Sequence, residues 1–376
     1  MNDVMSRFKE VVENRHDWIR SYKAESGRKI AGYFCDYLPE EVLWAGGLVP
    51  VRITGGRGNV VAADRYLQSN VCSFARRCFD QALNGVYDYL DAVAIPHTCD
   101  VITKMYDLWA YRMPTPEFVH YFWLPHKVFT KDAVTVMLGE VKRLRSSLAS
   151  HLGAEISDDA LKEAIAVYNR SRNLLRKVYE LRRSSPPLLS GEDAFAVSLS
   201  SVLMPKDLHS QWVEELLKEL EGKPSPLADR PRVAVAASAL DDLEIMRAVE
   251  EAGAWVVADD VCTGSRYFFD RVDESEPDPV KSLTRRYLEK LPCPRSVDSL
   301  TPRYDHLLGQ AREYQAGGVI FYILRCCDAH LFQYPLLKDR LEKEGLRTLY
   351  LQGDQTVGVN EQIINRIKAF TEMLST

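Results

Sequence analysis

The sequence lacks the features that mark membrane, secreted and nucleic-acid-binding proteins. No apolar run approaches the roughly 20 residues needed to span a bilayer. The N-terminal stretch is polar and helix-like, without the apolar core of a signal peptide. The net charge of −5 gives no general attraction to nucleic acid or to anionic membranes. We therefore expect a cytoplasmic protein that binds neither nucleic acid nor membrane.

Common metal and nucleotide motifs are missing as well. No C-x2-C pair occurs, so the spacing typical of structural zinc sites and of thioredoxin-type redox sites is absent. Neither a G-x-G-x-x-G fingerprint nor a glycine-rich Walker loop is present. A zinc-binding structural protein is accordingly the least favoured interpretation.

What the sequence does contain is a strand–helix alternation in two separate regions. The first region has strand-like runs at 29–34, 48–53, 90–95 and 118–124, and the second has them at 232–237, 254–258, 318–324 and 346–351. Such alternation predicts α/β lobes with parallel sheets. Between them, long helical patterns indicate a connecting segment, opened in part by an N-cap at Ser157. The expected division is an N-terminal α/β lobe (1–130), a helical segment (131–223) and a C-terminal α/β lobe (224–376).

Cysteines follow four of these strand-like runs. Cys35, Cys99, Cys262 and the pair Cys326–Cys327 each come just after an apolar run. Ligands of open α/β sheets bind beyond the carboxyl ends of the strands. The pattern therefore predicts that thiols converge on one cleft, which lies between the lobes if two sheets face each other.

The other cysteines differ in their surroundings. Cys72 stands at the start of a helix, where backbone amides favour a thiolate, and Cys293 lies between two prolines in a loop. Cys78 is expected to be a buried core residue. Of Cys326 and Cys327, strand alternation lets only one face the cleft. Single thiols from distant segments favour an iron–sulfur cluster held across a domain interface.

At this point the sequence resembles a known family, that of 2-hydroxyacyl-CoA dehydratase and benzoyl-CoA reductase subunits. The likeness runs from about residue 29 to the C-terminus and includes a late strand followed by Gly353, Asp354 and Gln355. Five separated segments carry it: GYFCDYLPEEVLWAGGLVPVRITGG, SNVCSFARRCFDQALNG, PHTCDVITKMYDLW, ADDVCTGSRYF and LRCCDAHLFQYPLLKDRL.

The resemblance implies two flavodoxin-like or Rossmann-like lobes with an iron–sulfur cluster in the cleft between them. The family's usual three cluster ligands fall here on Cys72, Cys99 and Cys327. It also implies a separate ATP-hydrolysing iron–sulfur activator that delivers single electrons at low potential, which agrees with the missing Walker loop. The expected substrate is an acyl-CoA or another small molecule.

One branch of the family, the double-cubane cluster proteins, carries further cysteines in positions matched here by Cys35, Cys262 and Cys293. Six thiolates would suit a double-cubane 8Fe–9S cluster in place of one 4Fe–4S cluster. We therefore favour a double-cubane type reductase, which would form a homodimer. A 2-hydroxyacyl-CoA dehydratase subunit or a benzoyl-CoA reductase subunit, each needing a homologous partner subunit, remains an alternative. A non-catalytic electron-relay or scaffold subunit is another.

Several polar residues near the cysteines are candidates for catalysis. His97, Asp36 and His330 are the expected proton-transfer or substrate-binding residues, although a hydrogen-bonded histidine in the cleft is an equally good interpretation of His97. For His330 and Arg266, exposed solvated positions explain the residues equally well. Arg52 and the nearby glycines could hold a CoA phosphate, but we interpret residues 55–58 as a flexible loop.

Overall fold

The computed structural model describes residues 2–375 and contains two parallel four-stranded sheets. In the first, the strand order is β2-β1-β3-β4; in the second, it is β6-β5-β7-β8. The strands are β1 (Ile30–Tyr33), β2 (Val49–Arg52), β3 (Ala92–Pro96), β4 (Phe118–Phe122), β5 (Arg232–Ala237), β6 (Trp255–Asp260), β7 (Gly318–Leu324) and β8 (Arg347–Gly353). The prediction of two α/β lobes with parallel sheets is confirmed.

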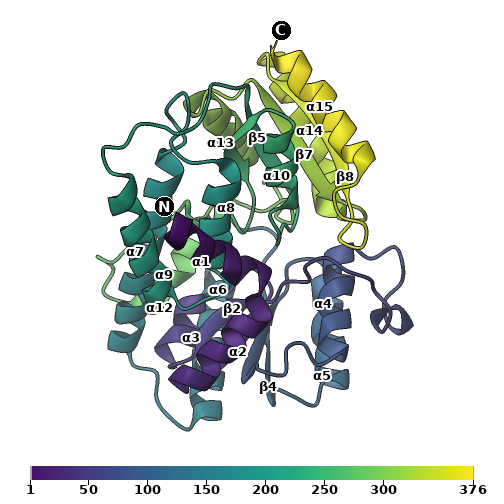
Figure 1. Ribbon diagram of the computed structural model, residues 1–376. Helices are drawn as coiled ribbons and strands as arrows, with labels where there is room; N and C mark the ends of the chain where they lie inside the picture. Colours follow the sequence, from purple (N-terminus) through teal and green to yellow (C-terminus); the bar gives the residue numbers. More distant parts are fainter. Residues whose placement is uncertain (1, 376) are drawn as a thin grey trace.

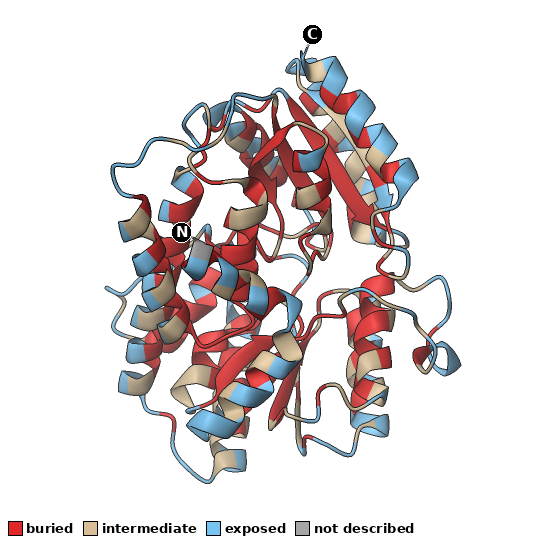
Figure 2. Cartoon of the chain, viewed as in Figure 1, coloured by how far each residue is buried: buried red, intermediate tan, exposed pale blue. Residues whose placement is uncertain are grey.

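The strands are buried because helices cover both faces of each sheet. Every residue of β5, β6 and β7 is buried, which explains their continuous apolar sequences. The edge strands β4 and β8 are partly accessible along their length. Figure 2 shows the buried strands surrounded by helices whose outer faces are exposed.

Sixteen helical segments accompany the strands within the described residues. Those before residue 130 are α1 (Asn2–Glu13), α2 (Arg15–Ser26), α3 (Glu40–Ala45), the 3-10 turn η1 (Ala63–Arg65), α4 (Ser73–Leu83) and α5 (Asp100–Arg112). Those of the middle are α6 (Lys131–Leu152), α7 (Asp158–Glu180), α8 (Gly191–Ser200) and α9 (Lys206–Leu220). The remaining ones are α10 (Glu244–Glu251), α11 (Ser265–Phe268), α12 (Pro279–Glu289), α13 (Leu300–Glu313), α14 (Asp328–Lys343) and α15 (Glu361–Ser375).

Local chemistry sets the beginnings of several helices. Ser157 is the N-cap of α7, as predicted, and its hydroxyl accepts a hydrogen bond from the Ala160 amide at 3.1 Å. Thr130 caps α6 and Ser190 caps α8 in the same way. The helix-like N-terminal stretch forms two helices, because the helical conformation is interrupted at Asn14 between α1 and α2.

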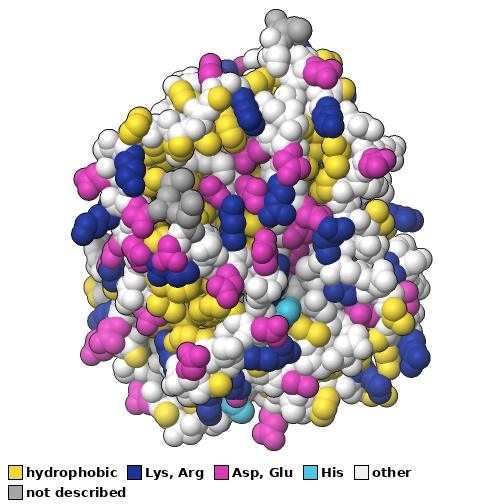
Figure 3. Space-filling model, in the orientation of Figure 1, with side chains coloured by type: hydrophobic (Ala, Val, Ile, Leu, Met, Phe, Trp, Pro, Cys, Tyr) yellow, Lys and Arg dark blue, Asp and Glu magenta, His cyan; other side chains and the backbone are white. Residues whose placement is uncertain are grey.

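The two lobes lie one above the other in Figure 1, with α6, α7 and α9 along one side. The C-terminal α15 packs on the outer sheet edge formed by β8, and α4 and α5 flank the first sheet. No helix within residues 2–375 has the length and apolar character required to cross a membrane. On the face drawn in Figure 3, acidic and basic side chains are intermingled.

Candidate functional site

The carboxyl ends of the two sheets meet at the boundary between the lobes. Arg52, the last residue of β2, donates hydrogen bonds across this boundary to the carbonyl oxygen of Cys262 at 2.8 Å and to its Sγ at 3.0 Å. Cys262 follows β6 directly in the chain. The loops after the strands of one lobe therefore face those of the other, where a ligand of an open α/β fold is expected.

One cysteine, Cys78, differs from the other seven in its solvent exposure. Cys78 is fully buried in the core, as predicted. The other seven cysteines are only partly buried, although free cysteine as a packing residue is normally buried completely. Their partial accessibility sets them apart from a cysteine that only fills the core.

Three thiols form what we call the helix-end group: Cys72, Cys99 and Cys327. Each is the N-cap residue of a helix, Cys72 of α4, Cys99 of α5 and Cys327 of α14. A helix N-terminus carries unpaired amides and the positive end of the helix dipole, both of which stabilise a thiolate. The three thiols thus come from both lobes and share the same local environment.

Electrostatics link the members of this group. Burial raises the pKa of Cys72 to about 12, while the amide of Ala75 acts against the rise and the Cys99 thiolate adds to it. The pKa values of Cys99 and Cys327 are raised by burial too, and amides three residues further on, Ile102 and His330, counteract this. The sulfurs of Cys72, Cys99 and Cys327 accept no well-aligned capping hydrogen bond. The amides therefore act mainly through their partial positive charge. Burial thus disfavours the thiolate at all three positions, and a bound cation would favour it.

The Cys326–Cys327 pair does not follow strand alternation. Strand β7 ends at Leu324, and Cys326 has φ +61°, in the left-handed region that most residues avoid. This turn joins β7 to α14 and leaves Cys327 at the helix start. Cys326 interacts electrostatically with Cys72 too, so both thiols of the pair lie near the helix-end group.

Three further thiols form what we call the cross-lobe group: Cys35, Cys262 and Cys293. Arg52 of the first lobe binds Cys262, and the Tyr37 hydroxyl accepts a hydrogen bond from the Cys293 amide at 3.0 Å. Burial and the Asp36 carboxylate raise the pKa of Cys35 well above its usual range, and Cys293 and Cys262 contribute to the rise. Charged and polar side chains, not helix ends, hold this group.

Asp36 anchors the cross-lobe group through a buried ion pair. Its Oδ2 lies 2.5 Å from Nζ of Lys290, and both side chains are almost completely buried. Although burial acts in the opposite direction, Lys290 and Arg52 lower the pKa of the Asp36 carboxyl to about 2. Asp36 also accepts a hydrogen bond from the Cys35 thiol at 3.3 Å. Asp36 is thus an ionised partner of Lys290 beside a thiol.

Cys293 connects the two groups. It interacts electrostatically with Cys35 of the cross-lobe group and with Cys99 and Cys327 of the helix-end group. Through Cys293, the six thiols predicted from the sequence are therefore neighbours at the boundary between the lobes.

The two predicted histidines occupy different environments. His97 is partly buried beside Cys99 and packs against the rings of Tyr121, Trp123 and His126. Burial and the neighbouring His126 lower its pKa. His330 is buried in the first turn of α14, and burial together with Arg303 and Arg266 lowers its pKa well below the usual value. Both imidazoles are therefore neutral near pH 7 and offer one donor and one acceptor each.

The alternative of an exposed position is wrong for both His330 and Arg266. Arg266 is 2% exposed, and its Nε lies 2.9 Å from Oδ1 of Asp260. Arg303 holds the other oxygen of Asp260 at 2.6 Å. This buried triad was missed by the sequence interpretation, because only the acidic end of the β6 sequence hints at it.

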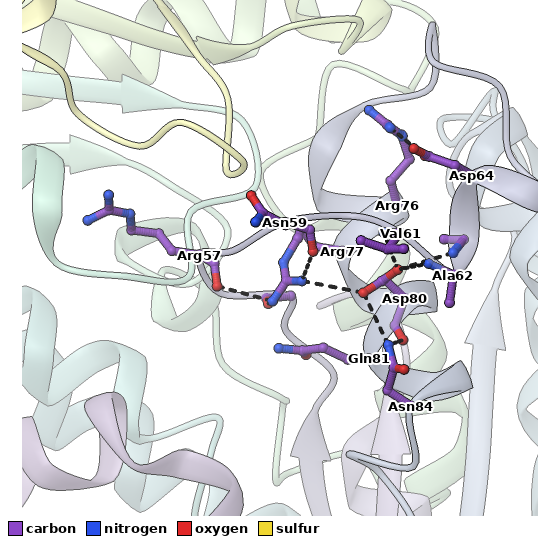
Figure 4. A network of polar contacts seen from close by, with 12 residues as sticks. Arg57, Asn59, Val61, Ala62, Asp64, Arg76, Arg77, Asp80, Gln81 and Asn84 are labelled. Carbon is purple, nitrogen blue, oxygen red and sulfur yellow. Dashed lines mark hydrogen bonds and ion pairs between the residues drawn. The ribbon is translucent and has the colours of Figure 1, made fainter.

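The interpretation of residues 55–58 as a flexible loop is also wrong. The Arg77 guanidinium donates to the carbonyl oxygens of Asn59, Arg57 and Gly55, at 2.5, 3.1 and 3.4 Å. Asp80 accepts hydrogen bonds from three successive loop amides, those of Val61, Ala62 and Ala63. Figure 4 shows this network fastening the loop to α4. The loop amides serve the fold, and Arg52 is engaged by Cys262, so neither is free to cradle a phosphate.

The donor set can be tested against the kinds of metal that thiols bind. Among residues 2–375, no three His, Cys, Asp or Glu side chains are grouped closely enough to hold a single metal ion. A tetrahedral zinc site needs all its donors about 2.3 Å from one point, so this arrangement does not fit it. In a cubane, each thiolate binds a different iron. A partly accessible set of thiols that come from separate loops at the lobe boundary fits that demand better.

Comparisons with known proteins identify the family of this chain. The model of the family described as 2-hydroxyglutaryl-CoA dehydratase, D-component, matches residues 35–374. The lactoyl-CoA dehydratase subunit beta of Anaerotignum propionicum is 27% identical over 372 residues, covering 99% of this chain and 98% of that protein. A benzoyl-CoA reductase subunit of Thauera aromatica is 26% identical and covers 94% of this chain and 92% of that protein.

A third relative is the (R)-2-hydroxyglutaryl-CoA dehydratase subunit beta of Acidaminococcus fermentans, 27% identical, with 99% of each chain covered. All three relatives are named as subunits of dehydratases or of a reductase. This chain aligns with almost the whole length of each relative. The chain is therefore an enzyme subunit that belongs to the 2-hydroxyglutaryl-CoA dehydratase D-component family.

Proposed function

We propose that this chain is an iron–sulfur subunit that accepts single low-potential electrons from a separate ATP-hydrolysing activator and passes them to a bound substrate. The observation that carries the proposal is the helix-end group, in which three helices from two lobes point their N-termini and thiols at one boundary. Cys72, Cys99 and Cys327 would hold the cluster. Bound there, an iron–sulfur cluster would supply one-electron chemistry at low potential.

The residues around the thiols have defined tasks under this proposal. The amides at the starts of α4, α5 and α14 stabilise the thiolates, and such contacts tend to raise a cluster's potential. Burial acts in the opposite direction because it disfavours added charge. His97, being neutral, would donate or accept a hydrogen bond beside Cys99 and would not contribute a positive charge.

The cross-lobe group bears on whether the chain holds one cluster or two. With Cys35, Cys262 and Cys293, the chain offers six thiols, which supports a double-cubane 8Fe–9S centre over a single 4Fe–4S cluster. Iron and sulfide analysis after strictly anaerobic purification tests this directly. About eight irons per chain are expected for a double cubane and about four for one cluster; a colourless protein without iron would overturn the proposal.

A second candidate function is supported by the relatives. Two of those compared are beta subunits of 2-hydroxyacyl-CoA dehydratases and one is a benzoyl-CoA reductase subunit, so each belongs to an enzyme with further subunits. Dehydration or ring reduction of an acyl-CoA would then require a homologous partner subunit. Turnover of CoA thioesters by this chain with an activator, alone and with such a partner, separates these functions from a homodimeric reductase. An electron-relay subunit would show reduction without turnover in both cases.

A further inference from the structure

Gln355, which belongs to a Gly-Asp-Gln motif without an assigned role, joins the two lobes next to Cys72. Its backbone amide donates to the hydroxyl of Ser73 at 3.1 Å, and Ser73 is the first residue of α4, directly after Cys72. Its carbonyl oxygen accepts a hydrogen bond from the Gly58 amide at 3.2 Å. Gln355 itself lies just beyond β8 of the other lobe and is 5% exposed.

The side chain of Gln355 completes a second connection. Its Nε2 donates to Oδ1 of Asp241, and the other carboxylate oxygen of Asp241 accepts a hydrogen bond from the Gly56 amide at 3.0 Å. Asp241 is 1% exposed. We call Gln355, Asp241, Ser73 and the loop amides of Gly56 and Gly58 the latch.

The rest of the motif shapes the chain for this purpose. A Cβ on Gly353 would lie 2.5 Å from the Tyr322 ring, so only glycine lets β8 end there. Asp354 accepts hydrogen bonds from the amide and the hydroxyl of Thr356, at 2.9 and 2.8 Å, which fixes the turn after the strand. The turn therefore presents the backbone of Gln355 to the opposite lobe and its side chain to Asp241, which in turn binds that lobe through the Gly56 amide.

The latch acts on a rigid unit. Arg77 and Asp80 of α4 bind the loop that carries Gly56 and Gly58 (Figure 4), so the loop and the helix move together. Fixing the loop and Ser73 to the second lobe consequently fixes the start of α4. The side chain of Cys72, the N-cap, makes no capping hydrogen bond that would hold it independently of this unit.

We propose that the latch positions Cys72 against the thiols of the opposite lobe, with Gln355 and Asp241 as positioning residues. Its importance for iron binding rests on the proposed function, but the placement of Cys72 does not. The distinction matters for the test, because the first measurement uses iron-free protein.

The test exchanges donor and acceptor within the latch. In Gln355→Glu, two carboxylates face each other without a donor, which costs a buried hydrogen bond and adds repulsion. In Asp241→Asn, a half-turn of the Gln355 amide brings Oε1, which has no partner among residues 2–375, to accept from the new amide, so little change is expected. In the double variant, the amide introduced at position 241 donates to the carboxylate introduced at position 355 and still accepts from Gly56. Gln352→Glu, on the exposed part of β8, is the matched control.

The readout is the rate at which iodoacetamide alkylates Cys72 in the iron-free protein, with buried Cys78 as internal reference. Gln355→Glu should raise the rate at Cys72 about tenfold, and the double variant should restore it to within about twofold of the wild type. The uncharged Gln355→Met removes the same donor without repulsion and should show the same selectivity if Gln355→Glu fails to fold. In iron-loaded protein, the unrescued variants should also release iron to a chelator faster.

Three results would overturn the positioning role: an unchanged rate at Cys72 in both Gln355 variants, an equal rise at all cysteines, or no rescue by Asp241→Asn. If selective alkylation of Cys72 occurs but no preparation binds iron, the latch stands and the proposed function fails. If iron binds but the alkylation rate of Cys72 does not change, the proposed function stands and the latch fails.

Discussion

The two groups of thiols are held in place in different ways. In the helix-end group, each cysteine begins a helix of its own lobe, so the local environment of Cys72, Cys99 and Cys327 comes from secondary structure. In the cross-lobe group, the supporting contacts join one lobe to the other: Arg52 to Cys262, Tyr37 to Cys293, and Lys290 to the Asp36 beside Cys35.

This difference shows which thiols depend on the closed arrangement of the lobes. Helix-end thiols keep their amides even if the lobes separate. The cross-lobe thiols lose their partners and leave buried charges unpaired, which is costly. We therefore expect perturbations of the second group to weaken the lobe boundary as well as the site.

The largest expected effect is on the iron content, after one thiol of each group is removed in turn. Cys99→Ser should leave less than about a tenth of the wild-type iron, because the cluster loses a ligand that both cluster models require. Cys35→Ser should leave about half if a second cubane depends on it. Iron and sulfide analysis of anaerobically purified proteins provides the measurement. Equal losses in the two variants would erase the distinction between the groups, and no loss in Cys35→Ser would indicate a single cluster.

Breaking the buried ion pair should be the largest effect on stability. Lys290→Met leaves Asp36 buried and unpaired, which is expected to lower the free energy of unfolding by about 3–5 kcal/mol. Lys281→Met is the matched control, since Lys281 lies on the exposed side of α12, 3.6 Å from Asp278, and should change stability by less than about 1 kcal/mol. Urea denaturation measures both. Similar values for the two variants would mean that the cross-lobe contacts carry no special weight.

Glu250 offers a test of how burial competes with helix-end amides, away from the thiols. Its carboxylate accepts hydrogen bonds from the amides of Gly191 and Glu192 at the start of α8. Burial nevertheless raises its pKa to about 7, just as burial outweighs the amide at Cys72. The folded state therefore binds a proton more tightly than the unfolded state, and Glu250 makes stability fall as pH rises from about 4.5 to about 7.

The Glu250→Gln variant lacks this proton. The difference in free energy of unfolding between it and the wild type should therefore shift in favour of the variant by roughly 3 kcal/mol across that pH range. Urea denaturation at several pH values measures the shift, and Glu251→Gln, an exposed neighbour, serves as the control. A difference that stays constant with pH would show that the amides fully offset burial, and a shift in favour of the wild type would show that the amides dominate.

The smallest expected effect is on stability, from a change in the loop that packs against α4 and so supports Cys72. A Cβ at Gly55 would lie 2.6 Å from Cβ of Arg77, so Gly55→Ala should cost about 1–3 kcal/mol by forcing the loop away from α4. At Gly139, in α6, an added Cβ meets nothing within 4 Å, so Gly139→Ala should stabilise by about 0.5–1 kcal/mol. Thermal unfolding measures both. A neutral Gly55→Ala would indicate that the loop adapts and does not constrain Cys72.

Much of the fold could be predicted from the sequence because its signals are local. The eight apolar runs became the eight strands, and the polar residue Ser157 was confirmed as a helix cap. Helix α14 was not predicted. It contains Pro335 and buries only His330, Leu337 and Leu341, so its apolar pattern is weak.

The candidate site was predictable only in part, for a related reason. Cysteines after strands are visible in the sequence, but their supporting partners are remote. Arg52 lies 210 residues from Cys262, and Asp36 lies 254 residues from Lys290. Gln355 is 282 residues from Ser73. No spacing rule connects such pairs, and only the folded arrangement of the lobes brings them together.

The separate origin of the two sheets has a consequence for how the protein matures. Each sheet pairs strands from one continuous stretch of chain, within residues 30–122 and 232–353. Each can thus close during synthesis before the other exists, because its pairing partners are already made. Cys72 and Cys99 are then in place in the first lobe before Cys327 is brought next to them by docking of the second lobe. Any inorganic centre bound by all three would be captured as the last act of assembly, and until then the waiting thiols would be open to oxidation.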